Sequence, residues 1–415
     1  MPDSTLAMIF VDLALIMAAA KLLGRLAVVF GQPPVVGEIA AGILAGPAIL
    51  GTQLSHTVFP AEARPALAVL ADLGVAAFMF TAGLELDRGV FTRTRTVVCA
   101  VSISAYLLPL AAGCVLAVLA LDRHRPGAPV SRAGFALFVG CALAVTAFPV
   151  LARILHDRNL IHTRTGQLSL GCAALIDLLA WAGLAIVLAL AAPPAQHWRW
   201  ALLAPAAGII WWIGRPMLAR LAQGRGEQTV IGLGLAAALL GGALTEWIGL
   251  HLIFGAFAAG VIFPRAHRRT AESGARVLAT ALLPAFFVIA GLSVDLTGVD
   301  LTGAGELLVI VAVAVAAKMG AVLAAGRLTG LTARTAATLA VLLNTRGLTE
   351  LVILHLGLSA GLLGPDLYSL LVLMALVTTA MTEPLLRRLG AAAPPPSDPD
   401  TVAESPTPVT GDRDG

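Results

Sequence analysis

Apolar runs of about 20 residues follow one another along almost the whole chain. Each run is about as long as a helix that crosses a hydrocarbon layer roughly 30 Å thick. Charged residues make up only 12% of the 415 residues, whereas soluble domains carry about 25%. Because so few charges cannot cover a water-facing surface, we expect an all-α, polytopic membrane protein with lipid as its surroundings.

The apolar runs predict about thirteen transmembrane helices followed by a polar tail. After Leu389 the sequence changes to AAAPPPSDPD, which cannot bury a core. The expected organisation is therefore a transmembrane domain over residues 1–390 and a disordered cytoplasmic tail over residues 391–415. The expected spans are residues 6–30, 35–51, 65–86, 96–121, 132–156, 166–192, 199–222, 228–248, 250–265, 272–292, 304–328, 333–359 and 366–389.

The arginines fall mainly on one side of these thirteen spans. One side receives eighteen arginines and the opposite side five. The positive-inside rule then places the N-terminus outside and the C-terminus in the cytoplasm, in a bacterial-type inner membrane. Because the basic residues lie in short loops rather than on one face, nucleic acid is not an expected partner.

Two pairs of similar segments indicate an internal duplication. The segment 37–44 (GEIAAGIL) resembles 255–262 (GAFAAGVI), and 78–87 (FMFTAGLELD) resembles 286–295 (FFVIAGLSVD). Both pairs are offset by seven spans, so the second copy crosses the membrane in the opposite direction. Inverted repeats of this kind are typical of secondary transporters.

Two spans are interrupted at matched positions, also seven spans apart. Irregular backbone at membrane depth is tolerated where it lines a cavity or is buried in protein. Pro149 alone would indicate a simple kink, but the match between the two breaks favours a transport site. The residues at the breaks are Thr146, Phe148 and Pro149 in span 132–156, and Asn344, Thr345, Arg346 and Gly347 in span 333–359.

Asp177 lies in the middle of span 166–192. An ionised side chain at the bilayer centre costs at least about 3 kcal/mol. One interpretation is a protonated or hydrogen-bonded structural carboxyl. The interpretation that we favour is a carboxyl that binds a monovalent cation when ionised and a proton otherwise, so that the two ligands compete for one group.

Three other charged residues lie at membrane depth. Lys318 is too deep to reach either surface and needs a partner, for which Asp177 is the first candidate; a purely structural salt bridge is the alternative. Arg346 and Glu350 are four residues apart and share a helix face, so they neutralise each other or pair with other spans. The sequence contains no nucleophile–base pair, metal cluster or phosphate loop, which argues against an enzyme and against a cofactor.

Several segments together resemble the monovalent cation:proton antiporter superfamily, in particular its Kef-type and Nap-type bacterial exchangers and plant cation/proton exchangers. The resemblance implies two inverted five-helix repeats, crossing broken helices, a mobile core domain and a dimerisation domain that forms a homodimer. It also implies an ion site on the span that contains Asp177. The segments are QPPVVGEIAAGILAGPAILG, FMFTAGLELD, TAFPVLARIL, ALIDLLAW, GAFAAGVIFP, LPAFFVIAGL, NTRGLTELVIL and TTAMTEPLL.

One departure from the family pattern concerns the ion site. Many relatives have a second acidic or amide residue where this chain has Ile176, and in two-acid relatives a lysine like Lys318 pairs with the first acid. We therefore expect Asp177, helped by Thr146 and backbone carbonyls at the breaks, to exchange one Na⁺ or K⁺ for one proton without net charge movement. Two alternatives are a gated K⁺ efflux system and, because of Ile176, a non-transporting membrane subunit or sensor.

Overall fold

The structure is a computed structural model that describes residues 3–51, 60, 63–85, 95–127, 130–160, 163–191, 208, 210–248, 252–294 and 301–390. The described residues are almost entirely helical. The predicted tail over residues 391–415 and part of the span 199–222 lie outside them. The α-helices are α1 (Asp3–Val29), α2 (Pro34–Ala45), α3 (Pro47–Leu50), α5 (Arg64–Glu85), α6 (Arg95–Leu119), α7 (Arg132–Ala144), α8 (Phe148–Asp157), α9 (Arg164–Ala191), α12 (Arg215–Ala222), α13 (Glu227–Ile248), α14 (Leu252–Ile262), α15 (Arg268–Leu292), α16 (Leu301–Leu328), α17 (Ala333–Leu343), α18 (Leu348–Ser359) and α19 (Pro365–Arg388).

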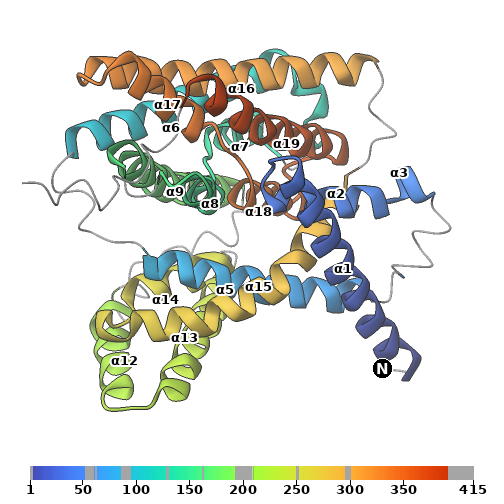
Figure 1. Ribbon diagram of the computed structural model, residues 1–415. Coiled ribbons are helices and arrows are strands. Elements are labelled where there is room, and N and C mark those ends of the chain that lie inside the picture. The colour runs from blue at the N-terminus through green and yellow to red at the C-terminus, as the bar shows by residue number, and fades with distance from the viewer. Residues whose placement is uncertain are drawn as a thin grey trace, which may run out of the picture.

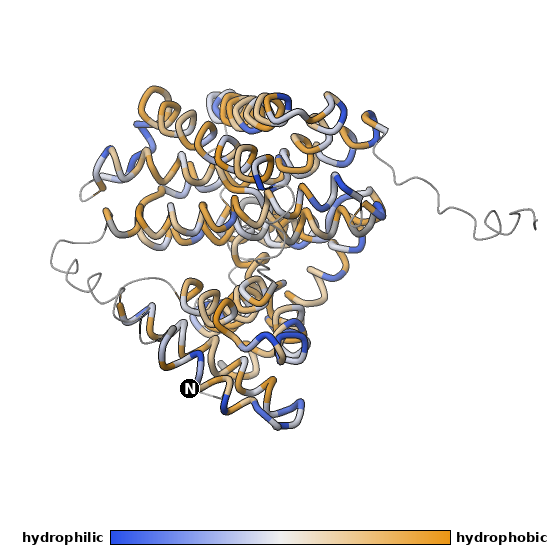
Figure 2. Tube along the Cα trace, turned by 90° about the vertical axis from the view of Figure 1, so that its left-hand side faces the viewer, coloured by the Kyte–Doolittle hydropathy of each residue, from blue (hydrophilic) through white to orange (hydrophobic). Residues whose placement is uncertain are grey.

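The helices are those of a membrane protein. Within the described part of the chain, eight helices are long and apolar enough to span a bilayer. Hydrophobic residues cover most of their length, and hydrophilic residues collect at helix ends and turns (Figure 2). Helix starts carry the usual N-terminal signals. Ser131 is the N-cap of α7, and its hydroxyl accepts a hydrogen bond from the Gly134 N–H at 3.0 Å, while Pro365 is the first residue of α19. The all-α, polytopic class predicted from the sequence is confirmed.

The helices form two layers (Figure 1). One layer contains α6 to α9 and α16 to α19 and is called here the broken-helix layer. The other contains α1, α2, α5 and α13 to α15 and is called here the panel layer. Helices α15 and α18 pack against each other where the layers meet. Each layer draws helices from both halves of the chain.

The panel layer contains two close glycine contacts that have the same form. Gly42 of α2 packs against Gly291 of α15, and a Cβ added at Gly42 would lie 2.2 Å from a carbonyl oxygen of α15. Gly260 of α14 packs against Gly83 of α5, and a Cβ at Gly260 would lie 2.2 Å from a carbonyl oxygen of α5. In the repeat alignment Gly42 matches Gly260, and Gly83 matches Gly291. The same backbone-to-backbone contact therefore occurs twice, each time between a helix of one repeat and a helix of the other.

Candidate functional site

The two predicted helix breaks lie against each other in the broken-helix layer. Helix α7 ends at Ala144 and α8 begins at Phe148, while α17 ends at Leu343 and α18 begins at Leu348. The backbone N–H of Ala147 in the first break donates to the Thr345 carbonyl in the second, at 3.0 Å. The unwound segments thus replace part of the hydrogen bonding that each loses by leaving the helix.

Thr146 closes the end of the opposite helix. Its hydroxyl donates to the carbonyl of Leu343, the last residue of α17, at 2.8 Å. The side chain is fully buried and is not among the residues that line the cavity at Asp177. If Thr146 binds a cation as predicted, it must do so with a hydroxyl that already caps a helix.

Two buried cations cap the C-terminus of α7. The Arg346 guanidinium donates to the carbonyls of Ala142 and Leu143, at 3.0 and 2.7 Å. The Lys318 ammonium donates to the carbonyl of Ala144. The last carbonyls of a helix lack intrahelical partners and carry its negative end, so two positive side chains stabilise this buried helix end.

Glu350 balances Arg346 as the four-residue spacing predicted. Its Oε1 accepts from the Arg346 guanidinium at 2.9 Å, and the two side chains are 0% and 1% exposed. The other oxygen, Oε2, is buried and has no hydrogen-bond partner in the part of the chain that the structure describes. The ion pair is therefore completely desolvated.

Helix α19 supplies hydroxyl groups to the second break, a contribution that the sequence reasoning missed. The Thr379 hydroxyl donates to the Arg346 carbonyl at 2.7 Å and accepts from the Arg346 N–H at 3.1 Å. The hydroxyls of Thr345 and Thr382 are 3.3 Å apart. The signal was present, because the threonines recur on one face in the segment TTAMTE. Asn344, the other polar residue at this break, has a buried Oδ1 that no described residue contacts by hydrogen bonding.

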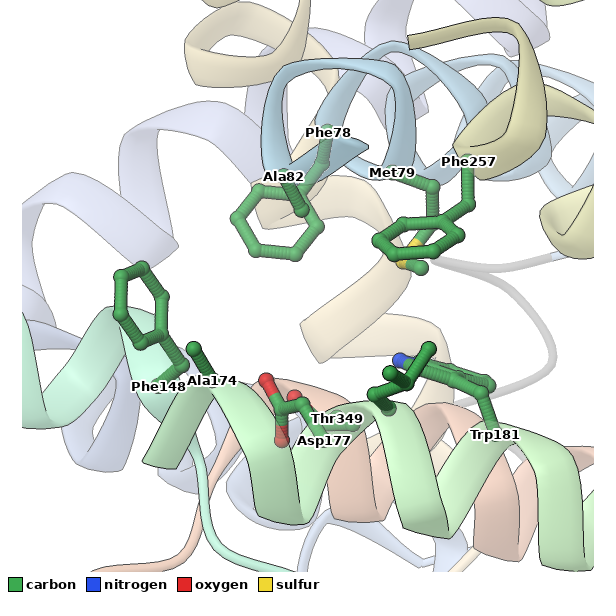
Figure 3. Close-up of a pocket in the computed structure, with 10 residues that line it drawn as sticks. Phe78, Met79, Ala82, Phe148, Ala174, Asp177, Trp181, Phe257 and Thr349 are labelled. Atoms are coloured by element: carbon green, nitrogen blue, oxygen red, sulfur yellow. The ribbon is translucent and has the colours of Figure 1, made fainter. Parts of the chain in front are cut away.

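Asp177 of α9 lines a small cavity between the two layers (Figure 3). The cavity volume is about 40 Å³, which is room for roughly three water molecules. Oδ1 of Asp177 is buried and has no hydrogen-bond partner among the described residues. The backbone N–H of Phe148, at the start of α8, hydrogen-bonds to the carboxylate. Ile176 is fully buried and does not line the cavity. The carboxyl of Asp177 therefore faces the cavity without a second acid from the neighbouring position.

Lys318 makes no salt bridge to Asp177. The ion pairs within 4.0 Å in the described part of the chain do not include this one, although the two charges are near enough to influence each other. Lys318 instead contacts the Ala144 carbonyl. Asp177, the first candidate partner predicted for Lys318, is thus close enough to interact electrostatically with it but does not form a hydrogen bond to it.

The opposite wall of the cavity is apolar. Phe78, Met79 and Ala82 of α5 and Phe257 of α14 face Asp177 across the open space (Figure 3). All the oxygen-bearing side chains that line the cavity belong to the broken-helix layer. Any ion held here is therefore bound by one layer and merely covered by the other.

A larger cavity leads toward the site from one end of the layer interface. It has a volume of about 750 Å³ and shares Phe78 with the cavity at Asp177. Its wall includes Lys21, Arg25 and Glu38 of the panel layer and Val150 of α8. We call it the vestibule.

The other end of the layer interface is closed by direct contact. The Tyr368 hydroxyl at the start of α19 donates to the carbonyl of Ala290 in α15, at 2.9 Å. Glu383, near the other end of α19, pairs at 2.6 Å with Arg158, which follows α8. Glu383 follows Tyr368 by fifteen positions, which correspond to about 22 Å of helix. The closed contact and the α8 end with its vestibule therefore lie at opposite ends.

Comparison with known proteins identifies the family. Residues 13–388 match the family of the transmembrane sodium/hydrogen exchangers. The chain belongs to this family. The resemblance indicated by its motifs is therefore confirmed, and the chain is a multi-pass membrane transporter of the cation/proton antiporter class and not an enzyme.

Individual exchangers are similar over most of their length. The chain is 36% identical over 410 residues to "Na(+)/H(+) antiporter NhaS4" of Synechocystis sp., covering 94% of this chain and 99% of that protein. It is 31% identical to "Cation/H(+) antiporter 15" of Arabidopsis thaliana, of which it spans about half (48%), with 92% of this chain covered. A solved structure of the sodium proton antiporter MjNhaP1 from Methanocaldococcus jannaschii has the same fold, with a TM-score of 0.64 at 13% identity, covering 93% of this chain and 97% of that one.

The candidate ion site of this chain is sparse. No group of three His, Cys, Asp or Glu side chains that could hold a metal ion occurs among the described residues. The candidate site consists of one carboxylate, the start of α8 and the start of α18. Such a set suits a weakly bound, transported ion better than a resident metal.

Proposed function

We propose that this chain exchanges Na⁺ or K⁺ for protons by alternating access, with Asp177 as the group that the two ions share. The observation that carries the proposal is a carboxylate with an unpartnered oxygen, facing a small cavity between two helical layers. A carboxylate in this setting binds either a metal cation or a proton, because each removes the charge that the other needs. The names of relatives, an Na(+)/H(+) antiporter and a K(+)/H(+) antiporter, support the substrate class.

The proposed architecture has thirteen crossings and two inverted five-helix repeats. The crossings are the eight long helices, the two interrupted pairs, the short α2 and α14, and the segment 199–222. The repeated glycine contacts support the duplication, because each joins one copy to the other and the two contacts involve repeat-related residues. Residues 1–390 form the exchanger domain, in which the broken-helix layer is the mobile core and the panel layer forms the homodimer.

The vestibule opens to the cytoplasm in the proposed topology. The arginine distribution places the Arg25 end of α1 and the C-terminus inside a bacterial inner membrane. Arg25 lines the vestibule, and the contact between Tyr368 and Ala290 then closes the outer side. With this topology, the open vestibule and the closed outer contact support an inward-open state of the proposed cycle.

The buried charges favour a one-for-one, electroneutral exchange. When Asp177 is ionised, it and Glu350 balance Lys318 and Arg346, so the formal charge of the cluster is zero. Adding one proton or one monovalent cation gives the same charge of +1. Because Lys318 is held by the Ala144 carbonyl, a cation at Asp177 need not displace its proton.

The test is transport by the full chain in proteoliposomes. With an imposed pH gradient, addition of Na⁺ or K⁺ is expected to dissipate the gradient for the wild type and not for Asp177→Asn, which keeps the shape but cannot ionise. The rate is expected to be independent of membrane potential. A potential-dependent rate overturns electroneutrality, and undiminished exchange by Asp177→Asn overturns the shared site. Flux far above about 10³ s⁻¹ would support the gated K⁺ efflux alternative, and a wild type that moves no cation would support the non-transporting one.

A further inference from the structure

Thr349 faces the cavity that contains Asp177. It is the second residue of α18, is 2% exposed, and lines the cavity from the same layer as Asp177. Figure 3 shows it beside the Asp177 carboxylate, at the margin of the open space. The sequence reasoning placed no role on this residue.

The hydroxyl of Thr349 makes no hydrogen bond among the described residues, and the helix break explains why. A buried threonine in a helix ordinarily donates to the carbonyl three or four residues earlier, as Thr378 does to Met374 at 2.8 Å. For Thr349 those carbonyls belong to Thr345 and Arg346, within the break. The first accepts the Ala147 N–H and the second accepts the Thr379 hydroxyl.

Several other oxygens near the breaks already accept or donate hydrogen bonds, and two that do not, Oδ1 of Asn344 and Oε2 of Glu350, belong to residues that do not line the cavity. The Thr146 hydroxyl caps α17, and the carbonyls at the end of α7 accept from Lys318 and Arg346. At the cavity, Oδ1 of Asp177 is buried without a hydrogen-bond partner among the described residues. The Thr349 hydroxyl, which also lines the cavity, takes part in none of the side-chain hydrogen bonds found among those residues. A partly dehydrated cation needs oxygen ligands to replace the waters it gives up.

We propose that Thr349 is a specificity-determining ligand, whose hydroxyl oxygen coordinates the transported monovalent cation together with Asp177. This inference rests on the proposed exchange function and adds the second oxygen that Ile176 cannot supply. Both ligands lie on the broken-helix layer, on α9 and α18, so the cation keeps them when that layer moves against the apolar panel wall. The remaining ligands are waters, for which the 40 Å³ cavity has space.

The test compares Thr349→Val, which keeps the shape and removes the oxygen, with Thr349→Ser, which keeps the oxygen. The assay is gradient dissipation in proteoliposomes with Li⁺, Na⁺ and K⁺. Thr349→Val is expected to raise the KM for the preferred cation about tenfold, to change the ratio of KM values among the three cations, and to change the maximal rate much less. Thr349→Ser is expected to resemble the wild type. Thr378→Val, which removes a buried hydroxyl away from the cavity, is the matched control.

Some outcomes overturn the inference while the exchange function stands. One such outcome is that Thr349→Val keeps the KM values and cation selectivity of the wild type. The other is that Thr349→Ser is impaired as much as Thr349→Val, which would indicate that the residue acts through packing and not through its oxygen. Purified protein gives a second readout, because a bound cation stabilises the fold. Stabilisation by Na⁺ or K⁺ is expected for the wild type and Thr349→Ser, whereas Thr349→Val is expected to need about tenfold more cation for the same stabilisation. If the valine variant does not fold, Thr349→Ala takes its place in both assays. A wild type that neither exchanges nor is stabilised would instead contradict the proposed function.

Discussion

The buried ion pair at the second break makes a quantitative prediction for stability. Arg346→Met removes a guanidinium that contacts Glu350 and two carbonyls at the end of α7. An uncompensated buried charge costs about 3–5 kcal/mol, and each carbonyl that loses its donor costs about 1 kcal/mol. We expect the free energy of unfolding to fall by roughly 5–7 kcal/mol.

The double variant Arg346→Met/Glu350→Met separates the two contributions. It removes both charges, so the cost of an unpaired carboxylate disappears and only the carbonyl contribution of about 2 kcal/mol remains. The double variant is therefore expected to be more stable than Arg346→Met by about 3 kcal/mol or more, although it changes more residues.

Reversible unfolding in mixed micelles, followed by far-UV circular dichroism, measures these differences. Arg387→Met is the control, because Arg387 pairs with Glu383 through a side chain that is 67% exposed and should lose less than about 1 kcal/mol. The reasoning is refuted if Arg346→Met loses no more stability than Arg387→Met, or if the double variant is less stable than Arg346→Met.

Three further predictions follow from the fold and the site. Gly42→Val and Gly260→Val should destabilise the protein to a similar degree in a thermal unfolding assay, because each introduces a Cβ 2.2 Å from a carbonyl oxygen of the facing helix; a severe effect at one position and none at the other would contradict the duplication. The KM for the cation should rise about tenfold per unit fall in pH in the acidic range, because protons compete for Asp177; a KM that is constant while the maximal rate falls would contradict competition. Tyr368→Phe removes the 2.9 Å hydrogen bond to the Ala290 carbonyl, and the loss of about 1 kcal/mol should shift the conformational equilibrium about fivefold toward outward opening. In a variant without the native cysteines, an impermeant thiol reagent should then label a cysteine introduced at position 290 faster. Unchanged labelling would argue against an outer closure there.

The sequence predicted the features that depend on residue type and order along the chain. The two breaks were predictable because Pro149 and the polar run Asn344–Arg346 interrupt apolar spans at matched positions. Asp177 was recognisable because ionisable groups are rare and costly at membrane depth. The pairing of Arg346 with Glu350 followed from their spacing on one helix.

Features that depend on the rotation of one helix relative to another were not predictable. In helices that are apolar on all sides, periodicity does not indicate which face meets which neighbour. The sequence therefore favoured Asp177, an opposite charge at similar membrane depth, as the partner of Lys318. In the structure the Lys318 ammonium instead contacts the carbonyl at the end of α7. Thr349 was overlooked for the same reason, although its position in the first turn after a break is a usable signal.

The interleaving of the two halves has a consequence for biogenesis. The chain inserts from its N-terminus, so α7 and Asp177 enter the membrane before Lys318 and Arg346 have been synthesised. During that interval the carbonyls at the end of α7 lack the two cations that cap them in the finished protein. An amino-terminal half alone is thus an assembly intermediate that requires water, lipid headgroups or a chaperone at its centre until the second half arrives.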